Sequence, residues 1–308
     1  MNQSLETPIL FLIFNRPDTT ERVFAEIKKA KPWKLFIASD GARENRDGEK
    51  ELVEKTRKIV LDNIDWKCEV ETLFRDENLG CKVAVSSAID WFFERVEAGI
   101  ILEDDCLPDP SFFGFCQELL EKYKDDERIM MISGDNFQDG IKRGDGSYYF
   151  SKITYIWGWA TWKRAWEKYD VDMKTFPKFE KENQIVNILS GKINQKIWLS
   201  RFRKVFEHKL DTWDYQWMYI IWIHSGFGIV PNVNLISNIG FRDDATHTIR
   251  ANKYANMNRD ELKKIIHPTF IIQEKSADEY FFKKEFTHVF LLKEIIFRGV
   301  KFFLDKIR

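Results

Sequence analysis

GIILEDD, residues 99–105, joins a short apolar run to three consecutive carboxylates. A continuous apolar run of this length is typical of a strand that is buried on both faces of a parallel sheet. Ligands bind to open α/β sheets beyond the carboxyl ends of the strands. The stretch therefore predicts an α/β fold with a functional site at the end of this strand.

Strands and helices alternate on both sides of this stretch. Apolar runs predict strands at residues 8–14, 34–39, 69–75, 98–102 and 129–132. Helical spacing of apolar residues predicts helices at about residues 19–30, 49–62, 82–97, 108–123 and 192–210. Strands that alternate with helices favour a doubly wound, mainly parallel sheet flanked by helices.

The three carboxylates Glu103, Asp104 and Asp105 are candidate ligands for a cation and a phosphate-bearing substrate. Adjacent carboxylates repel one another, so a fold that gathers them usually supplies a cation. Mg²⁺ and Mn²⁺ prefer oxygen ligands and commonly bridge phosphates to one or two carboxylates. The alternative is helix capping, because Asp109 and Ser111 lie nearby and acidic residues favour helix starts.

Other polar residues follow the remaining predicted strands. Arg16 could contact a diphosphate or form a surface ion pair. Asp40 could accept a hydrogen bond from a nucleotide base, or it could be a turn residue before Gly41. Asn78 and Lys82 frame a turn before a helix, where a phosphate could bind at the helix N-terminus. Their alternative is capping by Asn78 with Lys82 in solvent.

Asp214 lies between Trp213 and Trp217 and is a candidate catalytic base. Burial beside aromatic rings would raise the pKa of its carboxyl group and suit it to accept a proton. Asp211 lies three residues earlier and is the alternative base. A capped, aromatic-rich helix start would explain the same segment without catalysis.

His247 lies in a polar segment, DDATHT, at residues 243–248. An imidazole can bind a metal ion when neutral or pair with an anion when protonated. His247 is therefore a candidate ligand of a metal or a diphosphate.

The order of these clusters resembles a known family of enzymes. The clusters are residues 8–17, SDG at 39–41, NLG at 78–80, EDD at 103–105 followed by PDPSFF at 108–113, GW at 158–159 and WD at 213–214. Together they resemble the GT-A nucleotide-diphospho-sugar transferases, and within them the N-acetylglucosaminyltransferase I-like group and similar bacterial enzymes of surface-polysaccharide synthesis. The resemblance covers residues 8–245. It implies a Rossmann-like mixed sheet flanked by helices, followed here by a C-terminal helical tail.

The resemblance also implies roles on the donor side. Asp105, the last carboxylate of a variant Asp-x-Asp motif, would ligate Mn²⁺ or Mg²⁺. Asp104 would approach the ribose or the donor sugar. Asp40 would read the base, and Arg16 would lie near the nucleotide. UDP is the expected nucleotide by resemblance alone.

On the acceptor side, the resemblance implies that Gly158 and Trp159 face the acceptor. A carboxylate of the Trp-Asp segment would be the base of an inverting transfer. That family carries two adjacent Asp residues at this point, and here Tyr215 takes the second position. The choice between Asp214 and Asp211 therefore stays open.

The expected activity is transfer of a sugar from a nucleotide-sugar donor to a hydroxyl of a glycan or lipid-linked glycan. Two alternatives belong to other classes: a metal-dependent nucleotidyl- or phosphotransferase, and a non-catalytic carbohydrate-binding protein. The sequence has no GxxxxGK[ST] motif, which disfavours Walker-type nucleoside triphosphate chemistry. A sugar-binding module would not need three carboxylates after a strand.

Composition limits which cellular compartments and which binding partners are expected for the chain. The 308 residues have a formal net charge of -1, so no overall positive field favours nucleic acid. The start lacks a basic n-region, and the four Cys residues show no CxxC spacing, so we expect a cytoplasmic protein.

We expect one GT-A domain over residues 1–275, with a nucleotide-binding half at 1–135 and an acceptor-binding half at 136–275. An amphipathic tail would follow at 276–308. Apolar residues fall on one helical face of residues 278–308, and basic residues cover the remainder. This helix could lie on the inner face of the plasma membrane, or it could pack on its own domain.

Overall fold

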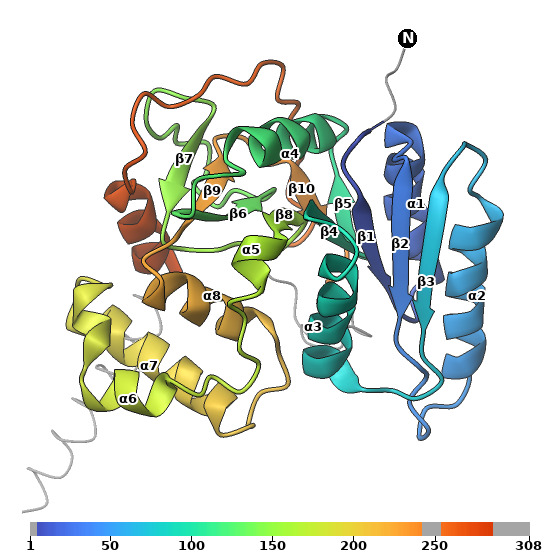
Figure 1. Cartoon of the computed structure of the whole chain (residues 1–308), viewed down its shortest axis with the longest axis horizontal. Helices are drawn as coiled ribbons and strands as arrows, with labels where there is room; N and C mark the ends of the chain where they lie inside the picture. The colour runs from blue at the N-terminus through green and yellow to red at the C-terminus, as the bar shows by residue number, and fades with distance from the viewer. Residues whose placement is uncertain (1–4, 242–253, 286–308) are drawn as a thin grey trace, which may run out of the picture.

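The structure is a computed structural model that describes residues 5–241 and 254–285. Eight strands form one mixed sheet with helices on both faces (Figure 1). The elements are β1 Ile9–Ile13, α1 Pro17–Ala30, β2 Lys34–Ser39, α2 Glu49–Asp62, β3 Glu69–Phe74, α3 Gly80–Phe93, β4 Ala98–Glu103, β5 Cys106–Pro108, α4 Ser111–Lys122, β6 Ile129–Ser133, β7 Tyr148–Ser151, β8 Trp159–Trp162, α5 Lys163–Trp166, α6 Phe176–Lys181, η1 Gln184–Asn187, α7 Lys192–Phe206, α8 Asp214–Ile223, β9 Phe227–Pro231 and β10 Ile236–Asn238.

The strand order of the large sheet is β3-β2-β1-β4-β8-β6-β9-β7. Strands β1 to β4 are parallel, as the alternating pattern predicts. Strand β8 runs antiparallel to both β4 and β6, and β7 runs antiparallel to β9. The predicted fold class, a mixed sheet flanked by helices, is confirmed, and the two strands that run against the others, β7 and β8, both lie in the predicted acceptor-binding half at 136–275.

Each face of the sheet has its own apolar core, because successive side chains of a strand point to opposite faces. In β4, Ile101 packs in the core that contains α3 and α8, and Leu102 packs in the core that contains α1 and α4. The same alternation directs Glu103 toward α3 and α8 and Asp104 toward α1. The carboxylates therefore leave the strand on different sides.

A small second sheet follows the carboxylates. Strand β5 pairs antiparallel with β10, which lies far away in the sequence. The N–H of Ile239 donates to the carbonyl oxygen of Asp105 at 2.8 Å, which fixes the backbone of the acidic turn. The sequence pattern assigned residues 108–110 to a helix, but α4 begins only at Ser111, after the Asp109 side chain accepts a hydrogen bond from the Ser111 N–H at 2.9 Å.

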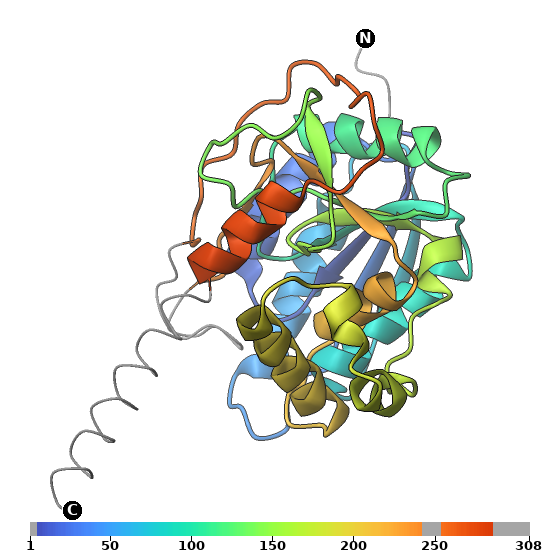
Figure 2. The ribbon, with the colours of Figure 1, turned by 90° about the vertical axis from the view of Figure 1, so that its left-hand side faces the viewer.

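The two predicted halves share one sheet, since β4 pairs with β8. A helix over residues 275–285, red in Figure 2, packs on this domain, with Ala277, Asp278 and Phe282 buried. The start of the predicted tail is thus part of the folded body. The rest of the tail, on which the membrane prediction depends, lies outside the described residues. Among those that are described, no helix is long and apolar enough to cross a bilayer.

Candidate functional site

A cavity of about 430 Å³ opens at the carboxyl ends of β1, β2 and β4. This is the edge at which open α/β sheets bind ligands. The cavity brings together eight of the residues that the sequence singles out: Arg16, Asp40, Asn78, Glu103, Asp104, Asp105, Asp211 and Asp214.

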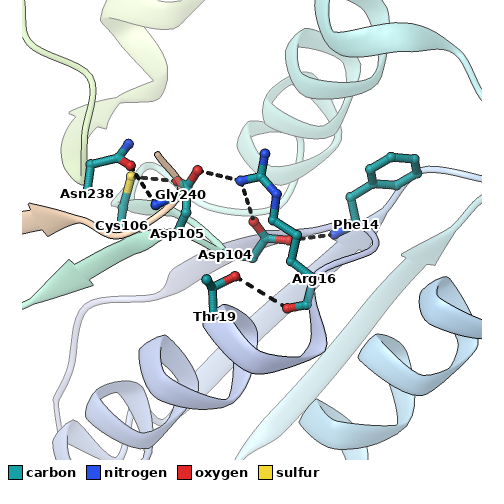
Figure 3. Close-up of polar contacts among 8 residues, drawn as sticks. All are labelled: Phe14, Arg16, Thr19, Asp104, Asp105, Cys106, Asn238 and Gly240. Carbon is teal, nitrogen blue, oxygen red and sulfur yellow. Dashed lines mark hydrogen bonds and ion pairs between the residues drawn. The ribbon is translucent and has the colours of Figure 1, made fainter. Parts of the chain in front are cut away.

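Arg16 links the first strand to the acidic turn (Figure 3). Its Nη1 atom lies 2.6 Å from Oδ2 of Asp105 and 3.9 Å from Oδ1 of Asp104. Asp104 is buried, and its Oδ2 accepts a hydrogen bond from the Phe14 N–H at 2.9 Å. Burial lowers the pKa of Arg16, but the two carboxylates more than offset this effect, and the net pKa is raised. Arg16 is therefore a positively charged side chain inside the cavity. Its ion pair with Asp105 lies in the cavity and not on the outer surface of the protein.

Glu103 and Asp104 hold protons more tightly than ordinary carboxyl groups. Burial, followed by the charge of Asp105, raises the pKa of Glu103 to about 8 and that of Asp104 to about 7. Three neighbouring acids share one guanidinium, so the turn would carry uncompensated negative charge if Glu103 and Asp104 lost their protons. A second cation beside Asp105 would relieve the remaining repulsion.

Asp40 and Asp211 both face the N-terminus of α3. The carboxylate of Asp40 accepts hydrogen bonds from the N–H groups of Leu79 and Gly80, at 3.0 to 3.2 Å. That of Asp211 accepts from the N–H groups of Cys81 and Lys82, at 3.1 and 3.0 Å. These are the donors that a helix leaves unpaired at its start. A phosphate at this helix N-terminus would have to displace two carboxylates.

Asn78 and Lys82, which the sequence placed at one phosphate site, lie in different surroundings in the structure. The side-chain amide of Asn78 donates to the carbonyl oxygen of Gly41 at 2.8 Å and lies in the cavity wall. Lys82 is absent from that wall, and its Nζ lies 3.5 Å from Nδ1 of His208. The geometry places Lys82 on the outer side of the helix, away from the acidic turn.

Asp214 begins α8 across the cavity from the acidic turn. Burial raises the pKa of its carboxyl group, and a hydrogen bond from the Thr212 hydroxyl lowers it in part. Asp211 is exposed and is already engaged with α3, whereas Asp214 is partly buried. Of the two candidate bases, Asp214 has the environment of a proton acceptor.

Trp159 does not line the cavity. It is 1% exposed, and its ring stacks on Trp213 with centroids 5.4 Å apart. Trp213 and Trp157 line the cavity instead. Gly158 has a positive φ of 65°, and a Cβ there would lie 2.6 Å from the Ile236 side chain. Gly158 and Trp159 thus lie outside the lining of the cavity, and Trp159 packs against the lining residue Trp213.

Two further arginines line the cavity and were not identified from the sequence. Arg75 directly follows β3, as Arg16 follows β1, so its position after a strand was an available signal. Burial lowers its pKa, and its guanidinium donates to the Ser87 hydroxyl at 2.8 Å. Arg43 lies in the loop after β2 and pairs with Glu49, a contact that no local pattern reveals.

The charges of the lining favour a bound cation. Among described residues the cavity wall holds six carboxyl groups (residues 40, 103, 104, 105, 211 and 214) and three guanidiniums (residues 16, 43 and 75). With Glu103 and Asp104 protonated, four carboxylates still face three guanidiniums, so a diphosphate would meet net negative charge there unless a cation came with it. Carboxylate oxygens are the ligands that Mn²⁺ and Mg²⁺ accept, and these ions complete their shells with phosphates and water.

The described residues do not provide a complete set of protein ligands for a metal ion. No three His, Cys, Asp or Glu side chains within residues 5–241 and 254–285 are grouped so that they could hold a metal ion. The predicted metal ligand His247 lies outside the described residues. Asp105 and Asp104 alone could hold a cation only if oxygen atoms of a bound phosphate or of water completed its shell.

Comparison with known proteins gives only remote likeness. No family model and no curated protein matches the sequence. Among solved structures, S. aureus TarS matches at 9% identity and a TM-score of 0.40, over 75% of this chain and 59% of that one. HddC from Yersinia pseudotuberculosis matches at 10% identity and 0.32, over 53% and 80% of the chains. A UDP-glucose pyrophosphorylase complexed with UDP-glucose matches at 11% identity and 0.31, over 53% and 78%. Likeness at this level assigns neither a family nor an activity.

Gly240 fixes the space available to Asp105. A Cβ at this position would lie 2.0 Å from Oδ2 of Asp105 and 2.7 Å from its Cγ. We expect Gly240→Ala to displace the carboxylate from Arg16 and to lower the free energy of unfolding by about 1–3 kcal/mol. Urea denaturation measures this. Gly114→Ala is the control, because a Cβ there meets nothing within 4 Å; equal effects of the two variants would contradict the prediction.

The raised pKa values predict that stability falls as pH rises. The unfolded chain releases protons that the folded chain retains, on Glu103 from about pH 4 to pH 8 and on Asp104 from about pH 4 to pH 7, so the free energy of unfolding falls by up to about 1.4 kcal/mol per pH unit for each group within its own range. Glu103→Gln should flatten this dependence in urea denaturation at pH 5, 6.5 and 8. Glu97→Gln, whose side chain is 89% exposed, is the control. Parallel curves for the wild type and Glu103→Gln would refute the prediction.

Proposed function

We propose that the chain is a glycosyltransferase that moves a sugar from a UDP-linked donor to an acceptor hydroxyl, with inversion at the anomeric carbon. The observation that carries the proposal is the single cavity in which Arg16, Asp105 and Asp214 meet at the carboxyl ends of the strands. The carboxylates of the acidic turn could bind a cation, and Arg16 could pair with the diphosphate that accompanies it. Asp214, on the facing helix, suits a proton acceptor. The setting that we propose is synthesis of cell-surface polysaccharide on a glycan or lipid-linked glycan.

The proposed reaction is one displacement. The acceptor oxygen forms a bond to the anomeric carbon while the bond from that carbon to the diphosphate oxygen breaks, and the acceptor proton passes to the carboxylate of Asp214. The burial that raises the pKa of Asp214 makes it a better proton acceptor near neutral pH. The protein holds donor and acceptor in line, which lowers the entropic barrier.

The departing diphosphate gains negative charge in this reaction. Arg16 lies where its guanidinium could pair with that charge, and Asp105 with Asp104 would hold Mn²⁺ or Mg²⁺ there. When bound, the divalent ion would neutralise charge on the leaving group. Arg43 and Arg75 border the same cavity and could contact the nucleotide.

Thermal shift with a panel of nucleotide sugars, with and without Mn²⁺, tests the proposal. A ligand that binds only the folded state raises its stability in proportion to the logarithm of ligand concentration over Kd. We expect UDP-sugars with Mn²⁺ to stabilise the chain, and slow release of UDP by hydrolysis. Stabilisation by UTP and release of pyrophosphate in the presence of a sugar 1-phosphate would instead indicate a nucleotidyltransferase. Binding of free glycan without metal or nucleotide would indicate a carbohydrate-binding protein.

A further inference from the structure

A second, smaller cavity of about 160 Å³ lies beside the first. Asp214 and Ile156 line both cavities, so the candidate base lies in the wall between them. The other lining residues of the small cavity are Ile153, Thr154, Tyr155, Trp198, Arg201, Tyr215, Met218 and Phe281. Its volume leaves room for about one sugar ring and not for a nucleotide as well.

We propose that this second cavity binds the terminal sugar ring of the acceptor. The inference rests on the proposed function, which needs an acceptor hydroxyl that reaches both the carboxylate of Asp214 and the face of the anomeric carbon opposite the diphosphate. Because Asp214 lines both cavities, an acceptor ring in the small cavity could place its hydroxyl at their common edge, where the oxygen loses its proton to Asp214 as it bonds to the anomeric carbon of the donor in the large cavity. The geometry thus assigns the large cavity to the donor and the small one to the acceptor.

The side chains of the small cavity suit a saccharide. The lining is mostly aromatic, with Tyr155 and Trp198 buried behind the surface and Tyr215 and Phe281 half-buried, so that a sugar could pack its apolar C–H face on the last two rings. Pockets that bind small polar molecules combine such apolar walls with a few placed polar groups. Here Arg201 and Asp214 are the charged groups, and both can hydrogen-bond to hydroxyls.

Aromatic contacts hold the guanidinium of Arg201 in place. It lies over the ring of Trp198 at 5.1 Å and over that of Tyr215 at 5.6 Å. Those two rings meet edge to face, with centroids 5.9 Å apart. The positive charge of Arg201 also lowers the pKa of Asp214 against the larger effect of burial. Arg201 is therefore a positioning and specificity residue for the acceptor.

The helix over residues 275–285 closes the small cavity. It contributes Phe281, whose ring contacts Tyr155 with centroids 5.2 Å apart. Asp278 anchors the helix, since its carboxylate accepts hydrogen bonds from the Ser151 hydroxyl at 2.5 Å and the Lys152 N–H at 3.0 Å. The acceptor site that we propose is thus completed by residues beyond the predicted boundary at 275.

Ligand-observed saturation-transfer NMR tests this assignment with the methyl glycosides of glucose, galactose and N-acetylglucosamine as probes, in the presence of UDP and Mn²⁺. We expect transfer to at least one glycoside in the wild type. Phe281→Ala and Arg201→Gln should weaken its binding about tenfold, because each removes a contact worth more than about 1 kcal/mol. Phe270→Ala, in the same C-terminal segment but 68% exposed, and Arg203→Gln, on α7 but paired with Glu180, are the matched controls.

Two measurements separate failure of this inference from failure of the proposed function. Thermal stabilisation by UDP and Mn²⁺ tests the donor site and should persist in all four variants. Circular dichroism checks that each variant is folded. If UDP and Mn²⁺ stabilise the wild type but no glycoside shows transfer, or if transfer survives both Phe281→Ala and Arg201→Gln, the acceptor assignment is overturned. If UDP and Mn²⁺ do not stabilise the wild type, the proposed function itself fails.

Discussion

Asp214→Asn should lower turnover by roughly 10²–10⁴-fold and leave UDP binding unchanged. The amide keeps the shape of the side chain and can still pair with the Thr212 hydroxyl, but it cannot accept the acceptor proton. Asp214 faces the acidic turn across the cavity, and Arg16 pairs with Asp104 and Asp105 instead, so donor binding should not depend on Asp214. Turnover of a UDP-sugar and the thermal shift with UDP and Mn²⁺ together measure the two effects.

Asp211→Asn is the matched control for this prediction. Its carboxylate caps α3 through the N–H groups of Cys81 and Lys82, so the amide should cost about 0.5–2 kcal/mol of stability. Turnover should remain wherever the variant is folded. If Asp211→Asn were inactive and Asp214→Asn active, Asp211 would be the catalytic base and the assignment of Asp214 would be wrong.

The placement of the acid turn could be predicted because strand ends are visible in a sequence. The pattern gave β2 and α2 their observed bounds, Lys34–Ser39 and Glu49–Asp62. Parallel strands end at one edge of a sheet, so polar residues that follow them must lie near each other. Arg16, Asp40 and Glu103 met in one cavity for this reason.

The partners of these residues could not be predicted, because they depend on contacts between distant segments. Asp211 caps α3 across 130 positions of sequence, and nothing local distinguishes it from a free carboxylate. Trp159 and Trp157 are equally aromatic and adjacent to Gly158, yet one is buried behind Trp213 and the other lines the cavity. Strand β8 decides between them, and its antiparallel pairing with β4 has no signature in the sequence.

Asp105→Asn is expected to abolish the part of UDP stabilisation that requires Mn²⁺. The carboxylate brings a full negative charge to the cation, and the amide offers only a neutral carbonyl oxygen, which is a weaker ligand for a hard divalent ion. Asp105 also pairs with Arg16 at 2.6 Å, so the variant releases Arg16 for the diphosphate. Metal-independent UDP binding should therefore persist or increase. Thermal shift with UDP, measured with Mn²⁺ and then with EDTA, resolves the two contributions.

Asp109→Asn separates cation binding from helix capping. The carboxylate of Asp109 accepts hydrogen bonds from the N–H and the hydroxyl of Ser111 at 2.9 and 2.6 Å, and it does not line the cavity. Asp109→Asn should lower the free energy of unfolding by about 0.5–2 kcal/mol, and stabilisation by UDP should still depend on Mn²⁺. If Asp105→Asn behaved in the same way, the acidic turn would be a structural device, and the diphosphate would have to be held by Arg16 and its neighbouring arginines without a metal.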